Sequence, residues 1–184
     1  LLLDLYDSTM CSVCTDGHRL SVAKVGLNTS VSESKMILPR KAVLEVLRLI
    51  SEIPDEYVLI QQTESHFYLK TEAYQFVSKL VSGNFPNYRK VLQIDNDKYF
   101  ISDRDILKKT LSRVSILANE KYRSVTLNLT NNKLVIDAVN KEQEEAIETL
   151  EVDSEGDDIS IGVNASYILD VLNSIPPGLV KISL

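Results

Sequence analysis

The sequence predicts an α+β protein whose antiparallel sheets and helices come from a repeated β-α-β-β-β unit of about 62 residues. Three observations lead to this prediction. A short β-rich run precedes an amphipathic segment that starts with capping residues, and this combination occurs three times. The amphipathic segments begin at Arg40, Asp103 and Ala165, which are 63 and 62 residues apart. Three alternating, strand-like segments follow each of the first two.

The strands and the helix of the first repeat are predicted from their residue types. The run Met36-Ile37-Leu38 is typical of a strand, and Pro39-Arg40 begins a helix because proline suits a first helical turn. Ahead of this repeat, residues 1–24 indicate three strands, with a hairpin turn at Asp16-Gly17 between the last two. Alternation after the helix predicts three more strands: Tyr57–Gln62, Ser65–Thr71 and Tyr74–Leu80.

The second repeat has the same order. Ser102-Asp103 begins a helix after the strand run Tyr99-Phe100-Ile101, and an Asn131-Asn132 turn joins the first two of its later strands. Those strands are expected at Ser124–Leu129, Lys133–Val139 and Glu145–Val152. A third repeat opens with Ile159–Val163 and a helix from Asn164-Ala165, and residues 179–184 match its next strand. Since the chain begins and ends inside repeats, we expect a piece of a longer protein.

The first two helices are predicted to bury one apolar stripe each and to present cations on the other side. The expected buried residues are Val43, Val46, Leu47 and Ile50, then Ile106, Leu107, Leu111, Val114 and Leu117. The cations are Arg40, Lys41 and Arg48, then Arg104, Lys108, Lys109 and Arg113. One such face is adequately explained by solvation, but two in consecutive repeats favour a shared anionic partner. The third helix shows Tyr167, Asp170, Asn173 and Ser174 instead.

The net charge of −6 does not exclude a polyanionic partner, because the charge is unevenly distributed. Residues 137–158 contain ten acids and one lysine, so this stretch carries −9 and the rest of the chain +3. The acidic stretch is compatible with an exposed strand that resists edge-to-edge aggregation, or with an edge that docks on a basic surface. Ile116 is predicted to lie on the polar side of its helix next to Leu117, either by chance or as part of an apolar contact patch.

Several function classes are disfavoured. No apolar run is long enough to span a bilayer and the first residues do not form a signal peptide, so we expect a soluble, cytoplasmic protein. Cys11 and Cys14 lie three residues apart on an alternating segment, which predicts reduced structural thiols. Residues 153–158 are predicted to form a solvated turn and not a calcium loop. We expect no metal and no cofactor. An enzyme that uses His18 with Asp16 or Cys14 would lack an oxyanion hole, so no catalytic residue is assigned.

Five segments resemble a known family, the bacterial DNA polymerase III beta subunits or sliding clamps. They are Thr15-Asp16-Gly17-His18-Arg19-Leu20, Leu38-Pro39-Arg40-Lys41, Phe85-Pro86-Asn87-Tyr88-Arg89-Lys90-Val91, Asn119-Glu120-Lys121-Tyr122-Arg123 and residues 163–172. The resemblance implies the DNA-clamp fold, with sheets outside and helices lining the inner face of a ring. It also implies that residues 1–93 are most of a middle domain and residues 94–184 most of a C-terminal domain.

The same resemblance implies a function and its residues. The whole protein would be a homodimer that encircles double-stranded DNA without sequence specificity and confers processivity in DNA replication, as a non-catalytic accessory subunit of the polymerase holoenzyme. DNA-facing residues would be Arg40, Lys41, Arg48, Arg104, Lys108 and Arg113. A pocket for short peptide motifs of the replicative polymerase, clamp loader and repair proteins would comprise Thr15, Gly17, His18, Arg19, Leu20, Pro86, Lys90 and Val91. Dimer contacts would be Ile116, Leu117, Glu144, Glu145 and Glu148.

One position departs from the family pattern and one alternative stays open. Lys90 stands where the family leads us to expect arginine, so the charge is kept but the planar fork is lost. A protein-docking module of the same fold that does not encircle DNA would fit the pocket segments as well as a clamp does. Neutralising the helix cations separates the two hypotheses.

Overall fold

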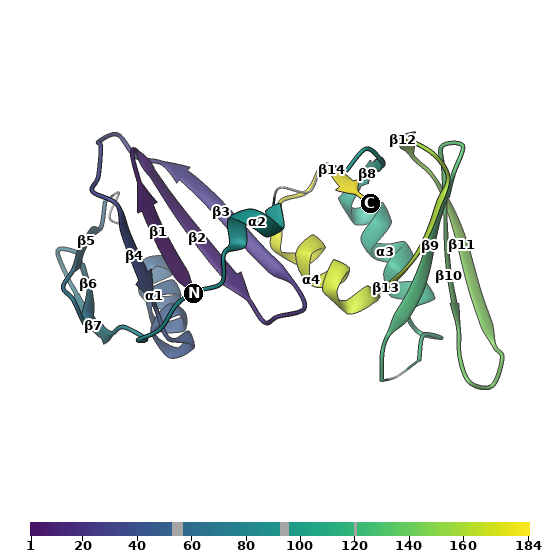
Figure 1. Cartoon of the computed structure of the whole chain (residues 1–184). Coiled ribbons are helices and arrows are strands. Elements are labelled where there is room, and N and C mark those ends of the chain that lie inside the picture. Colours follow the sequence, from purple (N-terminus) through teal and green to yellow (C-terminus); the bar gives the residue numbers. More distant parts are fainter. Residues whose placement is uncertain (53–56, 93–95, 120) are drawn as a thin grey trace. The chain divides into compact units, whose positions relative to one another are not determined.

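The computed structural model describes residues 1–52, 57–92, 96–119 and 121–184. The chain divides into two compact units, Leu1–Gln93 (unit 1) and Ile94–Leu184 (unit 2), whose elements are labelled in Figure 1. The predicted domain boundary at residues 93 and 94 and the motif residue Glu120 lie outside the described residues. Within the described ranges, no helix has both the length and the apolar character needed to cross a membrane.

Unit 1 contains a four-stranded sheet and a three-stranded sheet, both antiparallel. The first has the order β3-β2-β1-β4 and is made of β1 (Leu2–Tyr6), β2 (Thr9–Thr15), β3 (Leu20–Gly26) and β4 (Ser34–Ile37). The second has the order β5-β6-β7 and is made of β5 (Leu59–Gln62), β6 (His66–Lys70) and β7 (Gln75–Lys79). The helices are α1 (Arg40–Glu52) and α2 (Tyr88–Leu92).

Strand β1 supplies side chains to two separate apolar clusters, because successive residues of a strand point to opposite faces. Leu3 joins a cluster with Met36, Leu38, Phe67 and Leu69, against which Val43 and Val46 of α1 pack. Leu2 joins a second cluster with Cys11, Val13 and Tyr88. The four-stranded sheet of unit 1 is therefore covered on both faces along β1.

Unit 2 repeats the two-sheet plan with the orders β11-β10-β9-β13 and β12-β8-β14. The first sheet comprises β9 (Ser124–Thr130), β10 (Lys133–Val139), β11 (Glu145–Glu151) and β13 (Ile159–Asn164). The second comprises β8 (Tyr99–Asp103), β12 (Asp153–Glu155) and β14 (Leu179–Ser183). The helices are α3 (Arg104–Val114) and α4 (Ala165–Ser174), which pack against each other.

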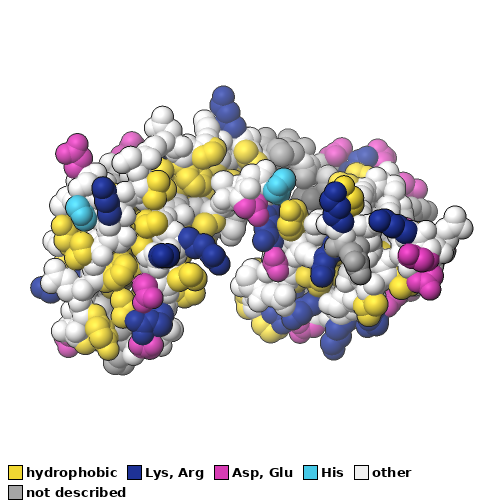
Figure 2. Space-filling view, turned by 90° about the horizontal axis from the view of Figure 1, so that it is seen from below, with side chains coloured by type: hydrophobic (Ala, Val, Ile, Leu, Met, Phe, Trp, Pro, Cys, Tyr) yellow, Lys and Arg dark blue, Asp and Glu magenta, His cyan; other side chains and the backbone are white. Residues whose placement is uncertain are grey.

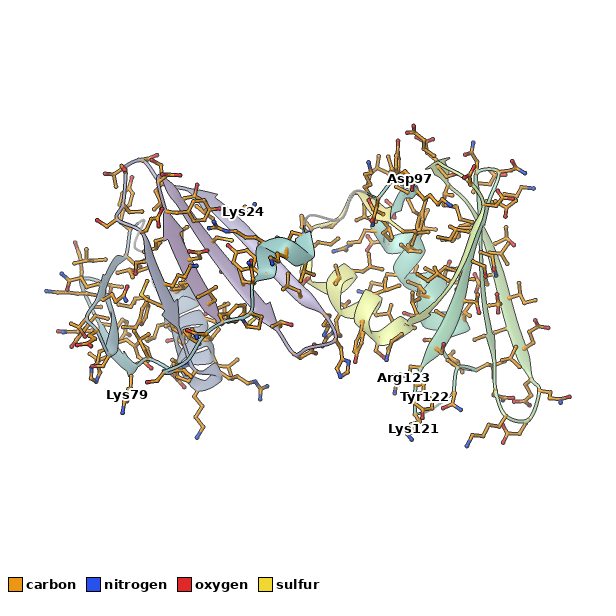
Figure 3. All side chains as sticks on the ribbon, viewed as in Figure 1. Lys24, Lys79, Asp97, Lys121, Tyr122 and Arg123 are labelled. Atoms are coloured by element: carbon orange, nitrogen blue, oxygen red, sulfur yellow. The ribbon has the colours of Figure 1, made fainter. Side chains whose placement is uncertain are left out.

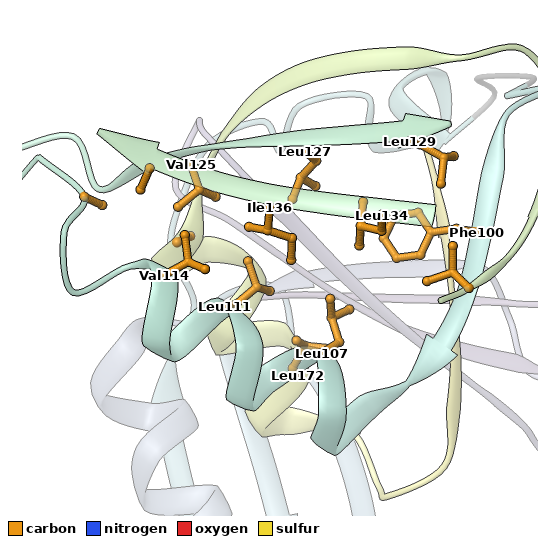
Figure 4. Close-up of a cluster of buried hydrophobic side chains, with 14 residues drawn as sticks. Phe100, Leu107, Leu111, Val114, Val125, Leu127, Leu129, Leu134, Ile136 and Leu172 are labelled. Atoms are coloured by element: carbon orange, nitrogen blue, oxygen red, sulfur yellow. The ribbon is translucent and has the colours of Figure 1, made fainter. Parts of the chain in front are cut away.

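The core of unit 2 lies between α3 and the sheet that contains β9 and β10 (Figure 4). Leu107, Leu111 and Val114 recur at helical spacing on one side of α3 and are fully buried or nearly so. They meet Leu127 of β9 and Ile136 of β10, which point to the same face of the sheet. Leu172 of α4 and Phe100 of β8 complete this cluster.

The predicted repeat is confirmed in its element order, since β4-α1-β5-β6-β7 is followed by β8-α3-β9-β10-β11. The second helix begins at Arg104, one residue later than predicted, with Asp103 as its cap. The Asp103 side chain accepts hydrogen bonds from the Asp105 and Ile106 backbone N–H groups at 2.9 and 3.0 Å. The predicted turn at Asn131-Asn132 is also present, with φ values of 47° and 62° that suit a two-residue hairpin loop.

The predicted apolar stripes of the helices are partly wrong. On α1, Leu47 and Ile50 are 65% and 46% exposed, and the buried face is formed by Ala42 and Leu49 with Val46 half-buried between them. On α3, Ile106 is 54% exposed because the buried face is centred nearer to Thr110, and Leu117 beyond the helix is only half-buried. Hydrophobic side chains accordingly reach the surface of unit 1 among Lys and Arg on the face drawn in Figure 2.

Two further elements differ from expectation. The sequence predicts a solvated turn at residues 153–158, but the first three of them form β12, which pairs with β8 as Asp153 with Ile101 and Glu155 with Tyr99. The Ser154 N–H and hydroxyl donate to Asn132 Oδ1, which ties this strand to the Asn131-Asn132 turn. The short helix α2 is not predicted, because five residues carry too little periodicity to indicate a helix.

We predict that Leu107→Ala lowers the free energy of unfolding of unit 2 by about 2–5 kcal/mol, because it removes a fully buried side chain and leaves a cavity. Ile106→Ala on the same helix is the matched control and should cost less than about 1 kcal/mol. Hydrogen exchange of β9 and β10 amides measured against urea concentration reports this quantity. Equal losses for the two variants would contradict the burial pattern of α3.

Candidate functional site

The turn between β2 and β3 is fixed by its own side chains. Thr15 and Leu20 pair across the two strands at its base. The Thr15 hydroxyl donates to the Arg19 carbonyl at 2.8 Å and accepts from the Gly17 N–H at 3.1 Å. Gly17 has a φ of 88°, which a side chain would strain. The loop is thus held in one conformation although it is exposed.

Asp16 adds a second set of bonds to this turn. One carboxylate oxygen accepts from the backbone N–H groups of His18 and Arg19, both at 3.0 Å, and the other lies 3.1 Å from Arg19 Nε. The hydrogen bond from His18 and then that from Arg19 lower the pKa of Asp16 below its ordinary 3.8, because they favour the charged carboxylate. The turn therefore depends on an ionised Asp16.

The second predicted pocket segment contains α2 and the residues before it. Tyr88 is buried at 5% exposure, whereas Val91 is 54% exposed and Pro86 and Lys90 are also exposed. The predicted pocket residues of this segment thus present apolar and cationic groups at the surface, next to a tyrosine that is anchored in the interior.

One apolar cluster of unit 1 receives a side chain from each of the two pocket segments. Leu20 from the β2–β3 turn and Phe85 from the second segment both pack against the buried residues Leu2, Cys11, Val13 and Tyr88. Of the predicted pocket residues, Leu20 packs against this cluster, whereas Pro86 and Val91 are not among the described side chains packed on it. The two predicted pocket segments therefore share this cluster through Leu20 and Phe85.

A cleft of about 640 Å³ lies along the second segment, on the side of Ile37, Gln62 and Lys79. Of the predicted pocket residues only Pro86 lines it. Sequence reasoning also missed Asp4 and Tyr6 of β1, which contact Arg89 of α2. The signal that could have found them is Tyr88-Arg89, which lies inside a segment that resembles the family but receives no role from the sequence.

The six predicted DNA-facing cations differ in their surroundings. Arg48 pairs with Glu45 at 3.1 Å and with Glu52 at 3.4 Å, and Arg113 pairs with Glu148 of β11. The Arg104 side chain is 14% exposed, pairs with Asp105 at 2.6 Å and donates to a backbone carbonyl of residue 175. Within the described part of the chain, no ion pair involves the remaining three: Arg40, Lys41 and Lys108.

The predicted dimer residues lie on one side of unit 2. Ile116 is 78% exposed, and with Leu117 it lines a cleft of about 410 Å³ whose other wall includes Asn140 and Glu142. Glu144 and Glu145 stand at the start of β11, which is an edge strand of its sheet. Arg113 lowers the pKa of Glu148 through their hydrogen bond, so this carboxylate already has a partner inside the unit.

Three further side chains from a segment that resembles the family lie together before β9. Lys121, Tyr122 and Arg123 are exposed and are labelled in Figure 3, and Lys121 Nζ lies 5.0 Å from the centre of the Tyr122 ring.

On β2, Cys11 is buried and Cys14 is exposed, and both are free thiols. Among the described residues there is no group of three or more His, Cys, Asp or Glu side chains that could hold a metal ion.

Two family models match consecutive parts of the chain. The DNA polymerase III beta subunit central domain matches residues 1–87, and the C-terminal domain of the same subunit matches residues 89–184. A beta sliding clamp from Vibrio cholerae is 42% identical over 184 residues, covering 100% of this chain and 50% of the relative. That from Escherichia coli K12 is 39% identical over 175 residues, covering 95% and 48%.

The solved structures that are similar to this chain include sliding clamps as well. The sliding clamp of Pseudomonas aeruginosa, crystallised with griselimycin, superposes with a TM-score of 0.95 at 42% identity and covers 100% of this chain and 50% of that one. The predicted clamp fold is therefore confirmed. The chain spans about half the length of the curated relatives it matches.

We predict that the amide proton shifts of His18 and Arg19 follow the titration of Asp16 with an inflection below pH 3.8. A lowered folded-state pKa means that Asp16 stabilises the turn above pH 3.8 and that this contribution is lost as the pH falls through the folded-state value. An NMR titration measures both shifts, and Asp16→Ala should remove the inflection. An inflection at or above pH 3.8 would contradict the hydrogen bonding of the turn.

Proposed function

Because the chain belongs to the family of bacterial DNA polymerase III beta subunits, the beta sliding clamps, we propose that it contributes two domains to a ring that holds DNA-processing proteins on duplex DNA. The observation that carries this proposal is that central-domain and C-terminal-domain models match consecutive parts of the chain, residues 1–87 and 89–184. In this role the chain catalyses no reaction and acts as a processivity factor of the replicative polymerase, in the cytoplasm.

The proposed partner site on unit 1 is the surface formed by the β2–β3 turn and the segment that contains α2. We assign it Thr15, Gly17, His18, Arg19, Leu20, Pro86, Lys90 and Val91. Its physical support is a turn held by several hydrogen bonds, with Leu20 packed on the apolar cluster and Val91 exposed at the surface. Such a surface suits a short peptide with apolar anchors, because little order has to be created on binding. The peptides would come from the polymerase, the clamp loader and repair proteins.

The proposed DNA contacts are electrostatic and carry no sequence information. Arg40, Lys41 and Lys108 are the strongest candidates, since they have no ion pair within the described residues. Arg48, Arg104 and Arg113 would have to exchange an existing acidic partner for a phosphate. These contacts are accordingly weaker than six free cations would give, which suits a protein that slides.

In the whole protein two copies would close the ring, and unit 2 would supply one side of each contact between them. We assign the contacts to Ile116, Leu117, Glu144, Glu145 and Glu148, with the exposed Ile116 as the apolar anchor. Glu144 is held by hydrogen bonds with Asn140 at 2.8 and 2.6 Å, so its carboxylate has a defined place at the end of the β11 edge. The acids of this edge would meet a basic surface of the second copy.

A docking module that binds partners without encircling DNA is the alternative function. The observation that favours it is the pairing of Arg48, Arg104 and Arg113 with acids of the same chain, which reduces the field available to phosphates. The two functions share the peptide site and differ in the need for the helix cations.

We predict that the triple variant Leu20→Ala, Pro86→Ala, Val91→Ala weakens binding of a Q-L-x-L-F peptide at least tenfold, because it removes apolar anchors of the site. Titration calorimetry measures the affinity. The control is Leu59→Ala, Val77→Ala, which truncates two exposed side chains on the other sheet of unit 1 and should leave binding unchanged. Saturable binding that survives the triple change would place the peptide elsewhere.

For the cations, we predict that Arg40→Ala, Lys41→Ala, Lys108→Ala lowers affinity for duplex DNA and reduces the slope of log K against log salt. The slope should fall by about 0.9 for each phosphate that the variant no longer neutralises. Fluorescence anisotropy at several salt concentrations measures this with two unrelated duplex sequences. Lys24→Ala, Lys70→Ala, Lys133→Ala is a control of equal charge change on strands. Equal effects of the two triple variants, with peptide binding intact in both, would support the docking module.

A further inference from the structure

A buried carboxylate on β1 has its partners on α2. Asp4 is 2% exposed and lies on the same face of the strand as Leu2 and Tyr6, which belong to the second apolar cluster of unit 1. A charged group in such a place is costly unless it is paired and hydrogen-bonded. The groups that pair with this carboxylate come from the C-terminal end of the unit's sequence.

Two consecutive residues of α2 meet this carboxylate. The Tyr88 hydroxyl donates to Asp4 Oδ2 at 2.8 Å, and Arg89 Nη2 donates to the same oxygen at 3.0 Å. These bonds join residues 84 and 85 positions apart in the chain. The Arg89 guanidinium also lies 4.6 Å from the centre of the Tyr6 ring, within the range of a cation–π contact. We call Asp4, Tyr6, Tyr88 and Arg89 the Asp4 cluster.

Helix α2 depends on such contacts because it is short. Its five residues cannot form a stable helix by backbone hydrogen bonds alone. Tyr88 and Arg89 are directed to β1 by the Asp4 cluster, and the next two residues, Lys90 and Val91, are left exposed. The side chains that the cluster holds therefore determine where the exposed pair stands.

We propose that the Asp4 cluster is a positioning device that holds α2 against β1 so that Lys90 and Val91 are preorganised for a peptide ligand. The inference rests on the proposed peptide site and adds to it the four residues of the Asp4 cluster, all of which lie outside the predicted pocket. Its physical basis is that a segment already ordered before binding has less conformational entropy to lose. The segment would otherwise be ordered by the peptide at the expense of affinity.

The protonation of Tyr88 supports a constant geometry. Burial, with a smaller contribution from the hydrogen bond to Asp4, raises the pKa of Tyr88 to about 12. The hydroxyl accordingly keeps its proton and remains a donor to Asp4 across the physiological range.

The test compares Tyr88→Phe with wild type, because this change removes one hydroxyl and keeps the ring in its cluster. We expect trypsin to cleave after Lys90 at least about fivefold faster in the variant, with cleavage after Lys70 and Lys79 in the same unit unchanged. We expect the affinity for the Q-L-x-L-F peptide to fall by about threefold to tenfold. Tyr74→Phe is the matched control, since Tyr74 is 47% exposed and lies on the turn before β7.

Asp4→Asn is the second variant, because it keeps an acceptor for Tyr88 and removes the charge that faces Arg89. It should give a smaller change than Asp4→Ala in both measurements. Cleavage after Lys90 that stays at the wild-type rate in Tyr88→Phe and Asp4→Ala would overturn the inference, as would faster cleavage spread equally over unit 1. If wild type fails to bind the peptide while cleavage after Lys90 alone responds, the proposed peptide site fails and the positioning of α2 stands.

Discussion

The packing of a helix on one face of a four-stranded antiparallel sheet is the interaction on which the rest of this structure depends. In unit 2, Leu107, Leu111 and Val114 of α3 are buried against the side chains of β9 and β10. Neither element could bury its apolar side alone, because each has only one such side. The chain uses the same element order in unit 1, where Val43 and Val46 of α1 pack on a cluster that contains Leu3 of the four-stranded sheet and Phe67 of the three-stranded sheet. Repetition of this packing explains why the sequence shows a period near 62 residues.

Features that depend on neighbouring residues could be predicted from the sequence. Asp103 caps α3 through bonds that reach only two or three residues ahead, and Asn131-Asn132 forms its turn from its own backbone preferences. Burial on the helices is predicted less well, since Leu47, Ile50 and Ile106 are exposed. Periodicity locates an apolar arc, but tertiary packing decides which part of that arc is covered.

The candidate site shows the same division. The turn from Thr15 to Leu20 is recognisable by its composition, and its order comes from local bonds of Thr15 and Asp16. The anchoring of α2 could not be predicted, because Asp4 and Tyr88 are 84 residues apart and nothing in the sequence relates them. The pairing of Arg113 with Glu148 escapes prediction for the same reason, although the sequence assigns each residue separately to a different surface.

That pair between α3 and β11 has a consequence for motion under the proposed function. Glu148 presents to Arg113 the same two-oxygen geometry that a phosphate would, so the arginine has an equivalent partner whether DNA is near or not. When Arg113 contacts a phosphate, the phosphate would replace Glu148 as its partner. When Arg113 leaves the phosphate, the pair with Glu148 would form again. Under the proposed function, the free-energy wells along the duplex would be shallower than those of an unpaired arginine. Glu148 would thus lower the free-energy barrier between successive phosphate contacts of Arg113 and ease movement along the duplex.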